Sequence, residues 1–172
     1  ADQPPRQGAH ASPFAVSGGG LVTGAVTVNS GGTLSLTGGG SANAVTVNAG
    51  GTISVPNFGT ATNFACASGS TLSFNFSTPN TVGQLTVAAA NGITNSGAAN
   101  SVTINLTGVV PADGTYPLIN YSGSLRGSGF GAYALGTVPL GKSYTLTNTG
   151  NAVQVIVATA PALVSVETRA DG

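Results

Sequence analysis

The sequence has very little charge. Its 172 residues include four Lys and Arg and four Asp and Glu, so the formal net charge is zero. Charged residues make up 5% of the chain, against about 25% in an ordinary soluble domain. A nucleic-acid binder needs a stripe of basic side chains, which four dispersed cations cannot form. The composition therefore excludes a nucleic-acid partner, and a neutral body favours self-association.

Methionine and tryptophan are absent, and cysteine occurs once. The lone Cys66 cannot form an internal disulfide, so we expect stability to come from packing, backbone hydrogen bonds or neighbouring subunits. No apolar run reaches the roughly 18 residues of a membrane-spanning helix, so we expect no membrane span. Because the chain starts at Ala1 without a Met, we expect an exported protein whose signal peptide has been removed. The expected location is extracellular or at the cell surface.

Glycine, threonine and branched apolar residues fill the chain in a repeated pattern. AVTVNSGGTLSL at 25–36 returns as AVTVNAGGTISV at 44–55, and CASGSTLSF at 66–74 continues the same phase. Looser copies occupy 84–94 and 101–108. Three copies in phase, with matching turn glycines, indicate a repeat architecture.

Each clear copy has two short strands of period two, separated by an Asn-, Ser- and Gly-rich turn. Thr33, Thr52 and Thr71 mark successive equal steps along the sequence. The hairpins of a sandwich would place turns every 8–12 residues or so without a fixed phase, whereas a β-solenoid needs about 20 residues per coil and stacks each coil on the last. The pattern predicts an all-β, single-domain β-solenoid with about 19–20 residues per coil and essentially no helix.

Composition divides the chain into three parts. The Pro- and Gly-rich segment 1–20 is predicted to be an extended N-terminal arm, and 158–172 a C-terminal tail strand. Between them lies the solenoid body, 21–157, with clear repeats in 21–108 and an irregular β closing region in 109–157. Within the closing region, SYTLTNTGNAVQVIVA predicts a β-hairpin, since two alternating strands flank an Asn-Thr-Gly-Asn turn.

A family resemblance emerges from these motifs. GGTLSLTGGG and AVTVNAGGTISV resemble the autotransporter-associated β-strand repeats of large bacterial surface proteins. GTYPLINYSGSLRG, followed by LGTVPLGKSYTLTNTGNAVQVIV, resembles the segment that commonly closes such arrays. The resemblance covers most of 21–157 and implies a right-handed β-helix displayed outside the cell.

Few motifs in the sequence suggest catalysis or ligand binding. GTVPLGKS at 136–143 matches the P-loop pattern, but strand and turn sequence follows it instead of a helix, so Lys142 is interpreted as a solvated turn residue. His10, the single histidine, has no convergent partners for a metal site or a triad. Asp113 is interpreted as a turn former. We therefore expect no enzyme activity, no cofactor and no metal.

Cys66 lies in phase with Val28 and Val47, which predicts a buried small side chain, with an intersubunit disulfide as the alternative. Three Asn-X-Ser/Thr sequons are possible glycosylation sites: Asn75, Asn105 and Asn120.

Neither end of the predicted stack has a charged cap, although monomeric solenoids need polar caps. We therefore expect a secreted structural subunit that self-assembles into an extracellular filament, joined end to end or by strand addition through the termini. The candidate subunit contacts are Pro13, Phe14, Val16, Ala162, Val164 and Val166. One alternative is a monomeric surface adhesin or passenger-type module that binds glycans or other cells. A β-helix lyase or hydrolase is another, but it needs clustered acids or bases that the sequence lacks.

Overall fold

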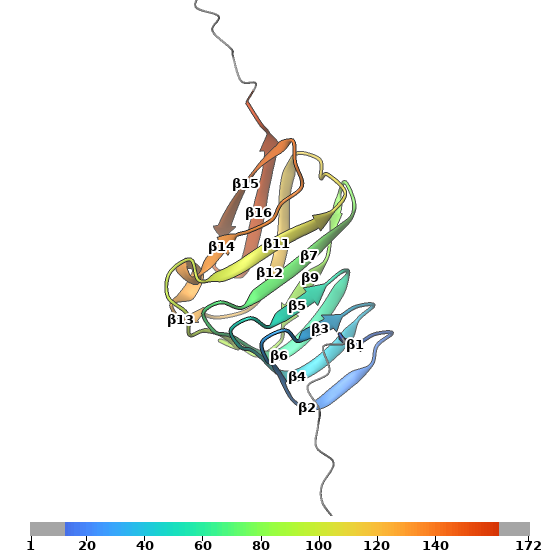
Figure 1. Cartoon of the computed structure of the whole chain (residues 1–172), viewed down its shortest axis with the longest axis vertical. Helices are drawn as coiled ribbons and strands as arrows, with labels where there is room; N and C mark the ends of the chain where they lie inside the picture. Colours follow the sequence, from blue (N-terminus) through green and yellow to red (C-terminus); the bar gives the residue numbers. More distant parts are fainter. Residues whose placement is uncertain (1–12, 162–172) are drawn as a thin grey trace, which may run out of the picture.

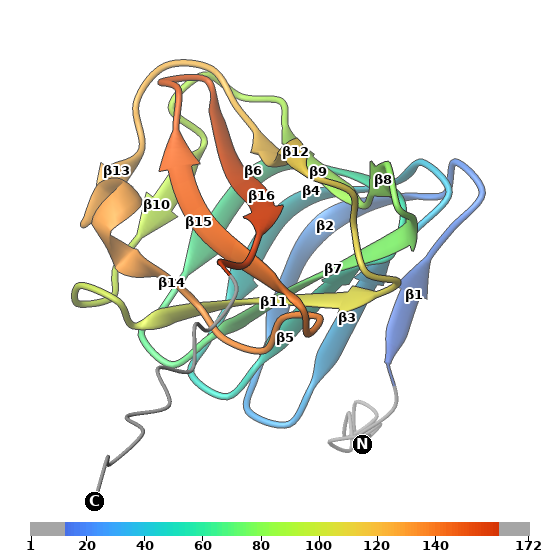
Figure 2. The ribbon, with the colours of Figure 1, turned by 90° about the horizontal axis from the view of Figure 1, so that it is seen from above.

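The computed structural model describes residues 13–161, and most of them lie in β-strands. The strands form two sheets that face each other (Figure 2). Within each sheet, the strands are stacked along the long axis of the molecule (Figure 1). Helix within 13–161 is limited to one 3-10 turn, η1 (Gly129–Ala132). The prediction of an all-β protein is confirmed for the described residues.

The first sheet has seven strands within the described residues. Along its main path the strands are β1 (Phe14–Val16), β3 (Thr33–Leu36), β5 (Thr52–Val55), β7 (Thr71–Thr78), β11 (Val102–Gly108) and β14 (Tyr133–Leu135). Every pair along this path is parallel. The seventh strand, β8 (Thr81–Val82), turns back to pair antiparallel with β7.

The second sheet has nine strands in the same part of the chain. Six of them pair in parallel: β2 (Leu21–Val28), β4 (Gly40–Val47), β6 (Phe58–Cys66), β9 (Gln84–Val87), β10 (Ile93–Asn95) and β13 (Arg126–Gly127). The other three are β12 (Gly114–Asn120), β15 (Lys142–Asn148) and β16 (Ala152–Thr159). β12 joins β9 in parallel and β16 antiparallel, and β15 then pairs antiparallel with β16.

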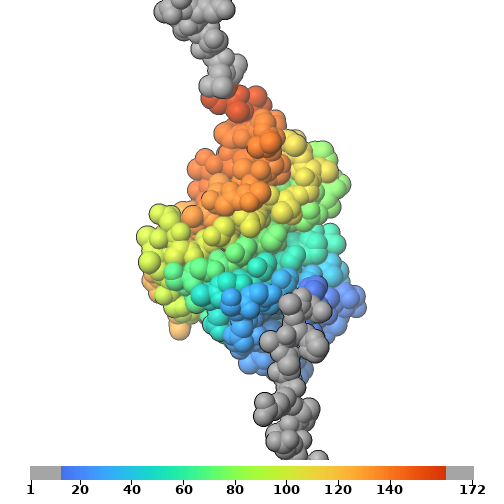
Figure 3. Space-filling view, in the orientation of Figure 1, coloured from blue at the N-terminus to red at the C-terminus, as the bar shows by residue number. Residues whose placement is uncertain are grey.

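Residues at equivalent positions of successive predicted repeats pair with each other in the first sheet. Thr33 pairs with Thr52, and Thr52 with Thr71. From β1 to β7 the chain alternates between the two sheets, so each repeat contributes one strand to each. Successive repeats appear as bands of colour in the space-filling view (Figure 3).

The core consists of columns of apolar side chains. Leu34, Ile53, Leu72 and Ile104 succeed one another in register, and all four are buried. The Thr and Ser residues between the buried positions of each strand point outward, because side chains alternate along a strand. Buried columns at the strand spacing of about 4.8 Å let one short motif build a continuous core.

The turns stack as closely as the strands. The Gly31 N–H donates to the Gly50 carbonyl and the Gly50 N–H to the Gly69 carbonyl, both at 2.9 Å. Beside them, Asn48 Nδ2 donates to Asn29 Oδ1 at 2.8 Å. The φ of Gly50 is +72°, a left-handed conformation that favours glycine. The Asn- and Gly-rich turns are therefore hydrogen-bonded ladders as well as corners.

The expected constant period is wrong beyond β7. Thr71 pairs with Thr103, and Thr103 with Ala134, so each of these steps along the sequence is much longer than the step from Thr52 to Thr71. The added residues lie partly in the second sheet, where β9 and β10 together continue the single strand β6. The turn between β9 and β10 contains Asn91, whose φ of +55° suits an Asn better than most residues. The looser copies in the sequence therefore belong to longer, interrupted repeats.

The ends of the described chain differ from their predicted boundaries. Phe14–Val16, assigned from sequence to the extended arm, forms β1 and pairs in register with β3. At the other end the predicted hairpin is confirmed as the antiparallel pair β15 and β16, and β16 extends to Thr159. The rest of the predicted arm and tail, 1–12 and 162–172, lies outside the described residues.

Replacing Gly40 with alanine tests how closely successive repeats approach. A Cβ at Gly40 would overlap the carbonyl oxygen of Val16, which accepts a 3.0 Å hydrogen bond from the Thr37 N–H. We expect Gly40→Ala to lower the free energy of unfolding by about 1–3 kcal/mol, the usual cost of overpacking. The control Gly24→Ala should be neutral, since nothing lies within 4 Å of its Cβ. Urea denaturation measures both, and equal destabilisation by the two would contradict the close approach.

Candidate functional site

The first rung, defined as β1 and β2, has unpaired outer edges. Among residues 13–161, β1 pairs with β3 alone and β2 with β4 alone. Two large apolar side chains are exposed here, Phe14 (54%) and Leu21 (65%). Residues 7–112 contain no Asp, Glu, Lys or Arg, so the rung lacks the charges with which natural proteins protect an edge strand. Within the described residues it is therefore an uncharged strand edge, of the kind that can pair with another chain.

The opposite end of the stack is closed by the antiparallel strands β15 and β16. Their connecting turn is hydrogen-bonded, with the Thr149 hydroxyl 2.6 Å from Asn151 Oδ1 and the Gly150 N–H 3.0 Å from Asn148 Oδ1. The Tyr121 hydroxyl donates to the same Asn148 oxygen at 2.6 Å. The two ends of the molecule therefore differ in strand direction and in polarity.

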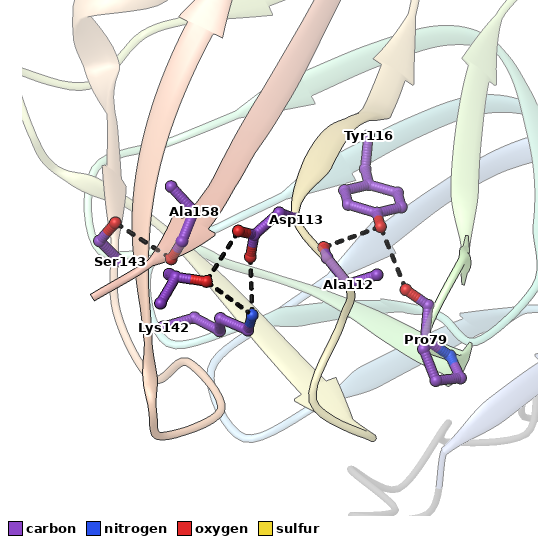
Figure 4. A network of polar contacts seen from close by, with 8 residues as sticks. Pro79, Ala112, Asp113, Tyr116, Lys142, Ser143 and Ala158 are labelled. Carbon is purple, nitrogen blue, oxygen red and sulfur yellow. Dashed lines mark hydrogen bonds and ion pairs between the residues drawn. The ribbon is translucent and has the colours of Figure 1, made fainter. Parts of the chain in front are cut away.

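A charged network holds this closing hairpin to the rest of the chain (Figure 4). Lys142 Nζ lies 2.7 Å from Asp113 Oδ1, the single ion pair found within 13–161. The Thr159 hydroxyl donates to Asp113 Oδ2 at 2.8 Å. The network therefore ties the start of β15 and the end of β16 to the loop before β12. The interpretation of Lys142 as a solvated turn residue is wrong, because Lys142 opens β15 and pairs with Asp113.

Tyr116 anchors the same loop on its other side (Figure 4). Its hydroxyl lies 2.9 Å from the Ala112 carbonyl and 3.1 Å from the Pro79 carbonyl. Its ring packs edge-on against Phe76 with centroids 5.1 Å apart. Tyr116 and the charged network therefore hold the loop before β12 from two sides and act as a structural clamp at the closing end.

The P-loop-like segment leads directly into β15. A P-loop opens a helix at this point, whereas this segment runs into a strand.

Cys66 is buried, as predicted. It pairs in register with Val47, which pairs with Val28, and its exposed fraction is 0%. Burial raises the pKa of its thiol to about 12, a rise that a hydrogen bond with Ser70 partly offsets. The thiol therefore stays protonated at neutral pH and cannot reach a neighbouring subunit, which argues against the alternative of an intersubunit disulfide.

Sequence reasoning missed a buried polar pair beside Cys66. Asn95 continues the column of Val28, Val47 and Cys66, yet it is fully buried and donates through Nδ2 to the Gly129 carbonyl at 2.8 Å. The hydroxyl of buried Tyr133 and Asn95 Oδ1 have no hydrogen-bond partner within the described chain, and burial raises the pKa of Tyr133. The constant sequence period does not lead from Cys66 to Asn95, so this buried polar position becomes visible only from the register of the second sheet.

A shallow groove lies on the outer face of the second sheet. It encloses about 150 Å³, and Ala44 and Ala65 are among its lining residues. Thr46, Asn63 and Arg126 also line it. The sequence pattern alone assigned Arg126 no site. It held a signal, because Arg126 is a rare charge inside GTYPLINYSGSLRG, the segment that resembles a repeat closure.

The structure describes three of the six residues predicted to contact another subunit. Pro13 and Phe14 are exposed at the first rung, whereas Val16 faces the core with 5% exposure. While the fold is intact, the Val16 side chain is therefore a core residue, and its role in a subunit contact is limited to its backbone. Three other candidates lie outside the described residues: Ala162, Val164 and Val166.

The three sequon asparagines lie in strands and are hydrogen-bonded through their side chains. Asn75 Oδ1 accepts from the Thr107 hydroxyl at 3.3 Å, and Asn105 Oδ1 from the Thr137 N–H at 2.8 Å. Asn120 Nδ2 donates to Gln84 Oε1 at 3.0 Å. Their glycosylation stays a prediction.

No helix within 13–161 has the length and apolarity needed to cross a membrane. In the same stretch, no three His, Cys, Asp or Glu side chains gather into a possible metal site. Comparison with protein-family models and with curated proteins finds no match.

Acid titration tests the clamp at the closing end. Hydrogen bonds from Lys142 and then Thr159 hold the pKa of Asp113 below its ordinary value. The unfolded chain therefore takes up this proton first, so the stabilisation is present above the ordinary pKa and is lost as pH falls through the lowered one. We expect urea midpoints to fall more steeply between about pH 5 and pH 2 for the native sequence than for Asp113→Asn. Parallel pH profiles would contradict the pairing.

Proposed function

We propose that this chain is a secreted structural subunit that assembles end to end into an extracellular filament. In this proposal the repeats wind as a right-handed β-helix, and the first rung of one copy pairs with the closing end of the next. The observation that carries the proposal is the pair of unpaired, uncharged edges at β1 and β2. The similarity of the repeats to autotransporter-associated β-strand repeats supports the extracellular location.

The hydrogen-bond pattern of β2 supports pairing with another copy. The Val28 carbonyl accepts from the Asn48 N–H at 2.9 Å, so Val28 directs its backbone groups toward β4. Neighbouring residues in a strand direct theirs to opposite sides. The N–H and C=O of Thr27 therefore face the open side, where an incoming strand can pair with them.

The difference between the two ends supports a filament over a closed pair. An identical surface on both partners would give a twofold dimer, whereas contact between unlike surfaces propagates if it does not close into a ring. β15 pairs with β16 on one side, and its other edge has no partner strand within the described residues. It lies at the end opposite the first rung (Figure 1), so each copy carries both halves of a head-to-tail contact.

A surface-binding role for the monomer is the second candidate. The observation that favours it is the outer groove with its cation, Arg126. We assign no reaction to the chain.

Assembly is tested with variants of the first rung. Thr27→Pro removes the outward N–H and leaves the bonds to β4 in place, which an edge strand tolerates. We expect it to abolish filaments in electron micrographs and to leave monomers in size-exclusion chromatography. Its melting temperature should stay within about 5 °C of the native value. Thr27→Val keeps the N–H and should assemble normally.

Leu21→Lys serves as a second variant in case the proline disturbs folding. It places a charge on the exposed rung without touching a backbone bond, and we expect it to block assembly too. Removing 1–12 or 162–172 separates stacking from strand addition, because stacking alone survives both deletions. A native chain that stays monomeric at every concentration would contradict the proposal.

A further inference from the structure

The groove on the outer face of the second sheet lies across one row of side chains. Thr46 pairs with Ala65, Ala65 with Thr94, and Thr94 with Arg126. Residues in register share a face of the sheet, so this row runs from a hydroxyl over a methyl group to a second hydroxyl and a guanidinium. Asn63, two residues before Ala65 on the same strand, lies on the same face. The small Ala65 between larger neighbours hollows the surface.

Arg126 is a cation without an acidic partner among the described residues. Of the three charged residues within 13–161, Asp113 and Lys142 pair with each other. Arg126 is exposed and pairs with no described carboxylate. Its planar guanidinium presents donors in a fork that matches a carboxylate.

The backbone that carries Arg126 is held firmly. The Ser128 N–H donates to the Asn95 carbonyl at 2.9 Å, and Asn95 Nδ2 donates to the Gly129 carbonyl at 2.8 Å. The buried Asn95 thus fixes the chain on the far side of β13. The opposite border contains Asn91, whose Oδ1 accepts from the Ser124 N–H at 2.6 Å, which leaves its Nδ2 as the group available to a ligand.

The polar groups around the groove suit a saccharide better than a peptide. Beneath the groove, β4, β6 and β10 pair with neighbours on both sides, and the open edge belongs to β13, whose two residues are too few to add a peptide strand. The hydroxyls of Thr46 and Thr94 and the amide of Asn63 have no partner among the described side chains, and they can both donate and accept hydrogen bonds. The volume of about 150 Å³ is below the roughly 300–1,000 Å³ typical of drug-sized ligands, which suits about one sugar ring.

We propose that this groove binds a uronic-acid residue of an acidic polysaccharide. Arg126 binds the carboxylate, and Thr46, Asn63 and Thr94 bind the ring hydroxyls. This binding site is independent of assembly, because end-to-end stacking leaves the outer face of the sheet open. A filament of such subunits would present one acidic-glycan site per copy.

Titration of the ¹⁵N-labelled chain with trigalacturonate tests the site by NMR. We expect the amide signals of Ala65, Thr94 and Arg126 to shift. The trimethyl ester of the same trimer carries the same sugar without the charge, and it should bind about tenfold or more weakly, the value of a charge-assisted hydrogen bond. The Leu21→Lys variant, held monomeric, gives the sharper spectra and keeps the groove intact.

Two variants that each remove one positive charge test whether Arg126 binds the carboxylate. Arg126→Gln should bring the affinity for trigalacturonate down to that for the ester. Lys142→Gln removes the same charge at the closing end and should leave the affinity unchanged. Ala65→Leu fills the groove and should weaken both ligands, and a melting temperature near the native value shows that each variant is folded.

Several outcomes would overturn the proposal. Equal affinities for the acid and the ester, or for Arg126→Gln and the native chain, would remove the carboxylate contact. Equal binding of a glutamate-rich peptide would point to unspecific attraction of acids. Tighter binding of a trisaccharide that carries a sulfate and no carboxylate would show that the recognised group is a sulfate. Shifts confined to residues outside the groove would move the site elsewhere.

Discussion

Each of the early repeats is held by parallel backbone pairing with the repeats before and after it, and the other features of the molecule depend on that register. Because Thr33, Thr52 and Thr71 pair in sequence, every column contains like side chains. The apolar columns form the core and the Asn and Gly columns form the turns. The core needs no long-range charge pairs, which explains how residues 13–112 fold without a single Asp, Glu, Lys or Arg.

The same register creates the two unlike ends. A parallel stack must begin with strands that have one neighbour, and here these are β1 and β2, with Phe14 and Leu21 exposed. At the other end the register gives way to antiparallel strands tied by Lys142 and Asp113. The few charged residues of the body therefore lie where the repetition stops. Arg126 follows this rule too, since it lies on β13, after the last regular repeat.

Local pattern made part of this architecture predictable and tertiary context determined the rest. The phase of the three Thr residues, the burial of Cys66 and the closing hairpin follow from alternation and turn chemistry within short windows. The change to longer steps after Thr71 occurs because β9 and β10 both pair with the single strand β6. A short stretch of sequence does not reveal such a pairing. The Lys142–Asp113 pair joins residues far apart in the chain, and the groove at Arg126 arises from four strands. Pattern reasoning can detect such features only after the register is known.

The strand register on which the other features depend can be measured in solution. NMR of the isotope-labelled chain reports which backbone protons lie close together across strands. The stacked register predicts contacts of the parallel type between Thr33 and Thr52 and between Thr52 and Thr71. Close Hα–Hα contacts between 25–28 and 33–36 would instead indicate a hairpin inside each repeat. That result would contradict the stacked register, and with it the open first rung and the groove.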